Sequence, residues 1–456
     1  MQPAPAPQAL STAQRWAFAS VNVPFSILHV PALGTLPALY AKYAHLDLVF
    51  MGTVLTLARV FDCVLDPAVG YASDRTASRF GRRKPWILAG AFIACVAAYF
   101  LFRPSPATGA VYFMVWYFLL YVGWTLGEIP HTAWLNELAH NYDERSRLST
   151  LRKTAALIGG LIFPLIVFLP MFPTTDITPK VTEFASYVVL VLMPITVCWA
   201  LRSLPNDSAS VPNRAPLLDV LRGVARNRPF WVFMASTACS GMASGMVAAL
   251  FFFYLDSYLG IANKLAHITL VVYFASLLGT NFWLRTMYRI GKHRTLAICC
   301  IATMLTLVAM ALIRPGEYAF WSIFIVFAVS AFCSTGVEAA GMAIMADIVD
   351  YDTLKTGERR AGNYFAAMAF VNKLNLAAGG GIAFILAGLF GFSPNQANGT
   401  WAMSGFFLAF IAIPIVLNTL AAGFAYRFPL DRRHQDIIRR CIEQREVRTP
   451  APETSA

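Results

Sequence analysis

Charged side chains are scarce in this sequence. Only 13% of its 456 residues are Asp, Glu, Lys or Arg, whereas an average soluble domain has about 25%. Since 57% of the residues are hydrophobic, a water-soluble fold would have too few polar side chains to cover its surface. The composition therefore argues against a soluble protein and favours a lipid environment.

Cysteine is also sparse. The eight cysteines are scattered, and no pair has the spacing of zinc ligands. Buried cysteines usually act as small apolar side chains, so we expect no disulfide and no bound metal. The N-terminal stretch lacks a basic segment followed by a short apolar core, and we predict no cleavable signal peptide.

Long apolar runs make up most of the chain. A membrane-spanning helix needs about 20 mostly apolar residues, and these runs do not alternate as membrane β-strands do. We therefore predict an all-α membrane protein of about 12 transmembrane helices. The expected spans are 16–42, 48–72, 85–103, 109–135, 150–172, 184–203, 229–259, 265–289, 293–314, 319–346, 362–392 and 401–427.

The basic residues lie in alternate loops. The net charge of +12 would suggest nucleic-acid binding in a soluble chain. Here one set of loops is rich in Arg and Lys, as around Arg82, Arg145 and Arg226, and the other set is poor. This is the positive-inside pattern. It predicts that the rich loops and both termini lie in the cytoplasm.

Two loops 210 residues apart share a motif. Arg75-x3-Arg79-x-Gly81 matches Arg285-x3-Arg289-x-Gly291, and Glu128 matches Glu338 at the same offset. The repeat predicts two related six-helix halves, an architecture in which transporters place the substrate between the repeats. We expect a disordered tail at 1–15, halves at 16–203 and 229–427, a cytoplasmic central loop at 204–228 and a cytoplasmic tail at 428–456.

The first of these loops resembles the loop 2–3 signature of the major facilitator superfamily, and the resemblance implies that fold. In the second copy Leu284 stands where the first has Asp74. The resemblance implies a gating function for the residues that make up the loop motif, which are Asp74, Arg75, Arg79, Gly81, Arg82 and Arg83.

Polar residues inside apolar spans are the strongest functional signal, because a charge at the centre of a membrane helix costs about 2.5–3.5 kcal/mol on insertion scales. Asp62 and Asp66 in the second span are four residues apart and share a helical face. Two carboxylates one turn apart repel unless a cation or a proton lies between them. The pair predicts a Na⁺ or H⁺ site; the alternative is a purely structural pairing of Asp66 with a cytoplasmic basic residue and of Asp62 with a Lys.

The fourth span contains a second polar group. Glu128 is a further intramembrane acid, and Thr125 lies three residues before it, where its hydroxyl could bind a cation. Trp124 could stack on a sugar ring or simply pack in the core. His131, three residues after Glu128, is a candidate proton relay.

Buried basic residues are candidate partners for these acids. Lys373 in the eleventh span could neutralise Asp62 or Asp66 when no ion is bound. Either Arg152 or Lys153, at the start of the fifth span, could pair with Glu128, and the sequence leaves that choice open. His29 in the first span could face the cavity or bond to a neighbouring helix.

Together these segments resemble the glycoside-pentoside-hexuronide:cation symporter family, the melibiose permease-like branch of the superfamily. The most specific match is a loop 10–11 motif with Asp347, Asp350, Arg359 and Arg360. The resemblance implies that Asp62, Asp66 and Thr125 bind the cation, and that Glu128 and Trp124 bind the sugar.

This sequence departs from the family pattern at two positions. Ser26 falls where the family's best-known member has a sugar-binding acid, and Leu65 replaces an Asn of its cation site. The first departure weakens the case for a galactoside, and the second favours H⁺ over Na⁺.

The resulting hypothesis is cation-coupled symport of a glycoside or related small polar solute by alternating access. We expect a monomer in the cell inner membrane, with no cofactor other than the coupling ion and no nucleic-acid partner. A lysolipid carrier of the same fold is the first alternative. A membrane enzyme or sensor is the second, and it is disfavoured because no nucleophile–base motif or phosphate loop stands out.

Overall fold

The protein, seen here in a computed structural model, is helical over nearly all of the chain that it describes. The structure describes residues 10–76, 78–139, 142–205, 227–357 and 361–430, and also positions 435, 437, 438, 440, 441 and 444. Within these residues, eleven helices are long and apolar enough to span a membrane, and the number rises to twelve when a bent helix pair counts as one span. The expected all-α fold with about 12 spans is confirmed.

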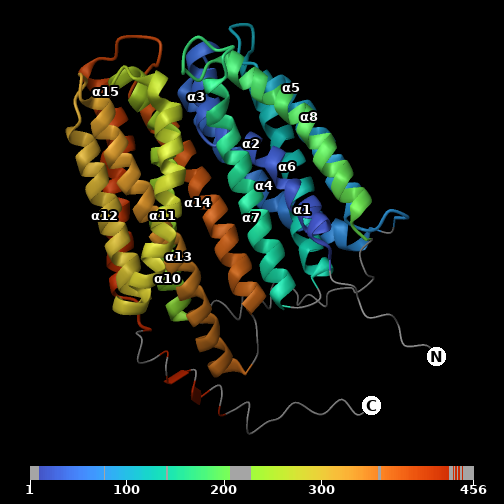
Figure 1. Cartoon of the computed structure of the whole chain (residues 1–456). Helices are drawn as coiled ribbons and strands as arrows, with labels where there is room; N and C mark the ends of the chain where they lie inside the picture. The colour runs from blue at the N-terminus through green and yellow to red at the C-terminus, as the bar shows by residue number, and fades with distance from the viewer. Residues whose placement is uncertain are drawn as a thin grey trace. The chain divides into compact units, whose positions relative to one another are not determined.

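The helices follow the expected spans closely. In the first part of the chain they are α1 (Thr12–Ser20), α2 (Asn22–Ala32), α3 (Thr35–Tyr43), α4 (Leu48–Arg75), α5 (Lys84–Leu101), α6 (Ala110–Leu138), α7 (Tyr142–Leu165) and α8 (Pro179–Ser203) (Figure 1). In the second part they are α10 (Arg228–Phe253), α11 (Leu265–Ile290), α12 (Lys292–Leu312), α13 (Ala319–Thr356), α14 (Ala361–Leu389), α15 (Thr400–Phe407) and α16 (Ile413–Tyr426). Short π-helical turns extend α10 at Tyr254–Tyr258 and join α15 to α16 at Leu408–Ala412.

The first span begins earlier than expected. Residues 12–15, assigned to a disordered tail from sequence, are the first turn of α1. Ser11 starts the helix because its hydroxyl accepts a hydrogen bond from the Gln14 amide, while the Gln14 side chain accepts one from the Ser11 amide. This reciprocal capping box satisfies two amides that would otherwise lack partners.

The first span is also broken. The segment Thr12–Ala32 meets Thr35–Tyr43 at an angle of 49°. Pro31 lies in the last turn of α2, and Gly34 precedes α3. Proline and glycine are the usual causes of a sharp helix bend, so the local sequence accounts for the break.

The helix α13 runs past the expected end of its span. It continues ten residues beyond 346, to Thr356, and ends at Gly357, whose φ of 76° is left-handed. A glycine in this conformation is a common helix stop. As a result Asp347 and Asp350, expected in a loop, lie on a helix.

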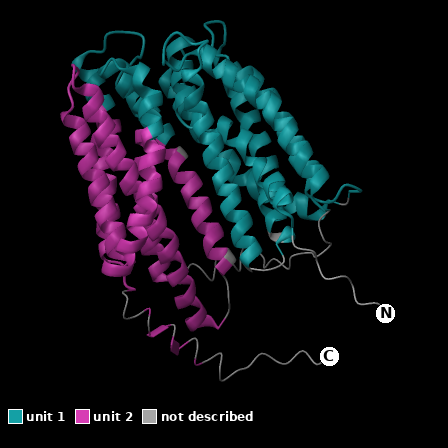
Figure 2. Cartoon of the chain, in the orientation of Figure 1, with its two compact units in different colours: residues 1–212, 248–270, 380–406 teal, residues 213–247, 271–379, 407–456 magenta. Residues whose placement is uncertain are grey.

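The chain forms two compact units (Figure 2). Unit 1 contains 1–212 together with 248–270 and 380–406, and unit 2 contains 213–247, 271–379 and 407–456. In unit 1, α6 packs against α4 and α5, and α7 packs against α1 and α2. In unit 2, α12 packs against α13 and α16. The expected halves at 16–203 and 229–427 stay a prediction, because the compact units divide the chain differently.

Unit 1 joins the first spans to the ends of later ones. A Cβ on Gly34 would lie 2.6 Å from the Ala248 carbonyl oxygen, and one on Gly52 would lie 2.5 Å from that of Gly381. The Lys42 ammonium pairs with Asp256 at 2.6 Å. Only glycine permits such backbone contact, so these positions hold α3 and α4 tightly against the ends of α10 and α14.

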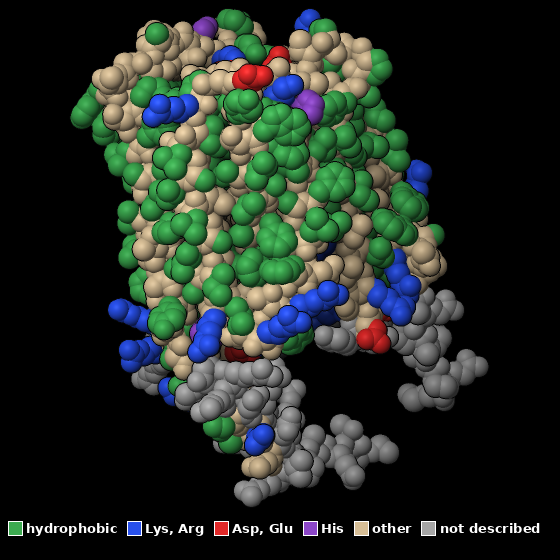
Figure 3. All heavy atoms as spheres, turned by 60° about the vertical axis from the view of Figure 1, so that its left-hand side comes forward, with side chains coloured by type: hydrophobic (Ala, Val, Ile, Leu, Met, Phe, Trp, Pro, Cys, Tyr) green, Lys and Arg blue, Asp and Glu red, His purple; other side chains and the backbone are tan. Residues whose placement is uncertain are grey.

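Apolar side chains cover the middle of the molecular face seen in Figure 3, and most of its Lys and Arg side chains lie toward the ends. Large apolar residues are widely exposed, including Phe92 at 70% and Leu278 at 71%. Exposed apolar surface of this extent is unfavourable in water but suits contact with lipid.

Candidate functional site

The helix α4 places Asp62 inside unit 1. Its side chain is buried, and its Oδ1 accepts a hydrogen bond of 3.0 Å from the Thr125 hydroxyl of α6. Thr125 is itself fully buried. Two of the three predicted cation ligands are therefore in direct contact across the α4–α6 interface.

Arg59 balances the charge of Asp62, which the sequence analysis missed. It lies one turn before Asp62 on α4, and its Nη1 is 3.6 Å from Asp62 Oδ2. Both residues are buried. Removing one partner of a buried ion pair leaves an uncompensated charge, so Arg59 and Asp62 belong to one electrostatic unit. The i,i+3 spacing in the sequence was the signal that could have revealed it.

Asp66 follows Asp62 by one turn on the same helix and is half-buried. The spacing puts the two carboxylates on one face of α4. With the Thr125 hydroxyl they form a set of oxygen donors, the ligand type that hard cations prefer. The Thr125 hydroxyl donates its proton to Asp62 and keeps its oxygen lone pairs for a cation, whereas protonation of a carboxylate needs no such set of ligands.

Two predicted solute-binding residues form a stacked pair. The rings of His29 on α2 and Trp124 on α6 lie 4.4 Å apart with an interplanar angle of 25°. Phe25, one turn before His29, meets Trp124 edge to face at 5.6 Å. Trp124 is adjacent to Thr125 in the chain, so the aromatic pair and the cation ligands share one turn of α6.

Glu128 forms an ion pair with Arg152 of α7. Both side chains are partly exposed, at 25% and 16%, so the pair is open on one side. Lys153 is exposed. The sequence left open whether Arg152 or Lys153 pairs with Glu128, and in the structure the partner is Arg152.

Ser26 lies at a close helix crossing. A Cβ on Gly159 of α7 would lie 2.9 Å from the Ser26 Cβ, which places Ser26 against the α7 backbone. It is half-buried. A role of Ser26 in solute binding, which its position in the family pattern implies, stays a prediction.

His131 packs against α1. Its ring stacks on Phe18 at 4.1 Å, and its Nε2 lies 3.0 Å from the Phe18 carbonyl oxygen. The contact with Phe18 is one of helix packing, and it occupies one of the two ring nitrogens. The relay role of His131 stays a prediction.

Lys373 lies on α14 in unit 2 and is half-buried. Its expected approach to Asp62 or Asp66, which belong to unit 1, stays a prediction.

The loop motif after α4 forms an ion-pair network. Arg83 Nη2 lies 2.5 Å from Asp74 Oδ1 and 2.6 Å from Glu137 Oε1, and Arg82 lies 3.4 Å from Glu137. Burial lowers the pKa of the Arg83 guanidinium, but the hydrogen bonds that Arg83 donates to Glu137 and Asp74 raise it, and the net direction is upward. Glu137, at the end of α6, is a member that the sequence analysis did not identify.

The other members of the motif lie around this network. Gly81 has a φ of 93°, which a side chain would strain. Arg75 lies over the Tyr71 ring at 3.7 Å, and Arg79 lies over the Phe80 ring at 4.7 Å. The motif therefore combines a buried centre with an exposed rim of stacked guanidinium groups.

The second predicted gating motif lies in unit 2. Asp347 pairs with Lys292 at 2.6 Å, and Asp350 accepts a hydrogen bond of 3.1 Å from Gln435. Arg359 and Arg360 lie outside the described residues. The acidic members are thus placed, and the gating role stays a prediction.

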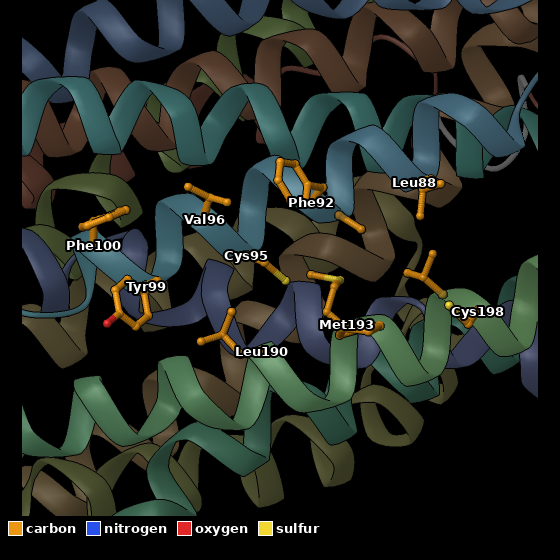
Figure 4. A pocket seen from close by; sticks show the side chains of 12 residues that line it. Leu88, Phe92, Cys95, Val96, Tyr99, Phe100, Leu190, Met193 and Cys198 are labelled. Carbon is orange, nitrogen blue, oxygen red and sulfur yellow. The ribbon is translucent and has the colours of Figure 1, made fainter.

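A pocket with a volume of about 440 Å³ lies between α5 and α8 (Figure 4). Its lining consists of apolar side chains, Cys95 and Cys198, and the ring of Tyr99, and it contains no charged residue. None of the predicted site residues lines it. We do not assign the solute to this pocket, because a polar solute needs hydrogen-bonding partners.

Comparison with known proteins identifies the family. The model of a family described as MFS/sugar transport protein matches residues 17–432. The glucuronide carrier protein homolog of Escherichia coli (strain K12) is 24% identical to this chain, with 88% of each sequence covered. The lactose permease of Lactobacillus delbrueckii subsp. bulgaricus is 25% identical, over 86% of this chain and 66% of that protein.

Solved structures agree on the fold. The crystal structure of the nucleoside transporter NupG superposes with a TM-score of 0.68 and 13% identity, covering 92% of this chain and 100% of that one. The helical architecture, the intramembrane acids and the match over nearly the whole described chain lead to one assignment. This chain belongs to the MFS/sugar transport protein family of multi-pass membrane transporters.

Proposed function

We propose that this protein is a symporter that couples the entry of a glycoside, or a related small polar solute, to the entry of a cation. The observation that carries this proposal is the adjacency of Trp124 and Thr125 on α6. Trp124 stacks on His29, and Thr125 donates to Asp62. One helical turn therefore touches both candidate sites, and a shift of α6 on binding one ligand alters the other site.

The solute class follows from the side chains around Trp124. Aromatic faces bind the C–H faces of sugar rings, and the Glu128–Arg152 pair offers an acceptor and several donors for hydroxyl groups. The names of two relatives, a lactose permease and a glucuronide carrier homolog, support a sugar or glycoside. The protein acts as a carrier and leaves the solute chemically unchanged.

We propose H⁺ as the coupling ion. Protonation neutralises the face shared by Asp62 and Asp66 without the full oxygen shell that Na⁺ requires. Leu65 supplies no ligand at the turn between them.

The location follows from the charge pattern of the loops. We propose that the protein is a monomer of the cell inner membrane with both termini in the cytoplasm, as the positive-inside rule requires. The Lys42–Asp256 pair then lies on the outer side.

Uptake of a panel of radiolabelled methyl glycosides and methyl glucuronides tests the function. Cells expressing the protein should accumulate at least one of them above the outside concentration when a proton gradient is imposed. Asp66→Asn should abolish the accumulation because it removes the charge that the cation neutralises. Gradient-driven accumulation in Asp66→Asn at the wild-type level would refute the assigned role.

A further inference from the structure

A chain of buried polar contacts leads from Asp62 to the bend of the first span. Arg59, which pairs with Asp62, also donates from Nη2 to the Tyr121 hydroxyl at 2.5 Å. The Tyr121 and Tyr117 hydroxyls are 3.3 Å apart, and Tyr117 donates to the Ala32 carbonyl at 3.2 Å. Arg59 and the two tyrosines are buried.

The chain has one direction. A carbonyl oxygen only accepts, so the proton of Tyr117 is committed to Ala32. A guanidinium only donates, so Tyr121 accepts from Arg59 and uses its own proton on Tyr117. Each hydroxyl thus accepts one bond and donates one, an arrangement in which the bonds polarise one another.

The chain ends at the break in the first span. Ala32 is the last residue of α2, where helix carbonyls lack partners within the helix. Two residues later, Gly34 lies so close to the Ala248 carbonyl oxygen that a Cβ on Gly34 would be only 2.6 Å from it. The acceptor of the chain is therefore next to the contact between the first span and the end of α10.

The same helix carries solute-binding candidates. His29 lies one turn before Ala32 on α2 and stacks on Trp124. A change in the direction of α2 at its end moves His29 relative to Trp124, because the helix is a rigid rod over this short distance.

We propose that Tyr121 and Tyr117 are positioning residues that link the occupancy of the cation site at Asp62 to the bend after Ala32, and so to the solute site. The proposal rests on the proposed function. When a cation neutralises Asp62, the hold of Asp62 on Arg59 weakens, and Arg59 is free to shift toward Tyr121. The tyrosine chain passes that shift to the Ala32 carbonyl and to the position of α2.

Hydrogen–deuterium exchange at residues 30–37 tests the link without a solute. The purified protein in nanodiscs is compared at constant pH in NaCl and choline chloride, and at pH 6 and pH 8 with correction for intrinsic exchange. In the wild type we expect one of these cations to change the exchange rate at 30–37 by about threefold or more. In Tyr117→Phe the rates with and without the cation should coincide.

Tyr112→Phe is the matched control. Tyr112 lies on the same helix and also donates to a backbone carbonyl, that of Phe100 at 2.8 Å. It takes no part in the hydrogen bonds that connect Asp62 to Ala32. It should keep the cation effect. If Tyr117 had a purely structural role, Tyr117→Phe would change the exchange rate at 30–37 equally with and without the cation. A cation effect in Tyr117→Phe as large as that in the wild type would overturn the proposal.

Solute affinity separates this proposal from the proposed function. In the wild type, a saturating cation should raise the affinity for the best methyl glycoside of the uptake panel by about fivefold or more. Tyr121→Phe should reduce this factor to below about twofold, while its melting temperature in detergent stays close to that of Tyr112→Phe. If the cation raises solute affinity in Tyr121→Phe as much as in the wild type, the proposed role of the tyrosines is wrong but cation coupling stands. If the cation leaves solute affinity unchanged in the wild type, cation coupling itself is wrong.

Discussion

The loops of the two halves share the same contact. In the first half Gly81 has a φ of 93° and Arg82 pairs with Glu137; in the second, 210 residues later, Gly291 has a φ of 93° and Lys292 pairs with Asp347. The repeat of both the backbone turn and the ion pair supports the duplication inferred from sequence. A feature kept in both copies serves the architecture of each half.

Inside the membrane the halves differ. At the same offset Asp62 and Asp66 correspond to Val272 and Ser276, so the second half lacks the acid pair. Glu338 corresponds to Glu128 but is exposed on α13. The turn and its ion pair therefore recur in both predicted halves, whereas the acid pair of the proposed ion site occurs in the first alone.

Glu128→Gln should have the largest effect. It removes the partner of Arg152 beside the aromatic pair, and we expect solute uptake to fall by about 100-fold or more, as for the loss of hydrogen bonds to a charged group. The matched variant Glu338→Gln should stay within about threefold of the wild type, because an exposed carboxylate contributes little. Uptake of the radiolabelled solute measures both variants. Similar losses of uptake in the two would mean that Glu128 and Glu338 do not differ in function.

Arg83→Gln should destabilise the protein more than Lys292→Gln. The first substitution leaves Asp74 and Glu137 facing each other around a buried position, at a cost of about 3 kcal/mol. Lys292 is 33% exposed, and its loss should cost about 1 kcal/mol. Thermal unfolding in detergent measures the stability of both variants. A larger loss of stability in Lys292→Gln than in Arg83→Gln would contradict the prediction.

For the proposed coupling ion, Thr125→Ala should strengthen H⁺ binding by about tenfold, because the hydrogen bond that Thr125 donates to Asp62 stabilises the ionised carboxylate. Its counterpart in the second half, Thr335, donates to the Phe332 carbonyl of its own helix. Thr335→Ala should therefore leave cation affinity unchanged. The cation dependence of uptake measures both values, and an effect in Thr335→Ala equal to that in Thr125→Ala would place the ion site elsewhere.

Gly81→Ala and Gly291→Ala should have equal and modest effects on stability. Both residues have the same positive φ, and alanine there costs about 1–2 kcal/mol through backbone strain. Thermal unfolding measures the loss of stability in each of the two variants. A clear inequality would mean that the two turns are supported differently.

The sequence was sufficient for the architecture because span length depends on local hydropathy. The span expected at 85–103 is observed at Lys84–Leu101, for example. The bend after Ala32 was not predicted, because proline and glycine are tolerated in membrane helices and bend only some of them. The extension of α13 was missed for a related reason: its last turns are polar and resemble a loop.

The candidate site residues were named from the sequence, but the contacts between them were not. Glu137 was missed because it lies at the end of an apolar helix, yet the offset of 210 residues relates it to Asp347, which was predicted. The choice of Arg152 over Lys153 depends on the rotation of α7 about its axis, which hydropathy does not fix. The tyrosine chain depends on the packing of α6 against α2 and α4, a long-range property that no local pattern records.

Solute-driven cation movement tests cation-coupled symport most directly. The purified protein is placed in de-energised proteoliposomes that contain a pH-sensitive dye, and a saturating transported glycoside is added outside. The account predicts inward proton movement in fixed ratio to solute entry, lost in Asp62→Asn. Proton movement that is absent and replaced by Na⁺ entry would correct the ion, and solute entry with no cation movement would contradict the account.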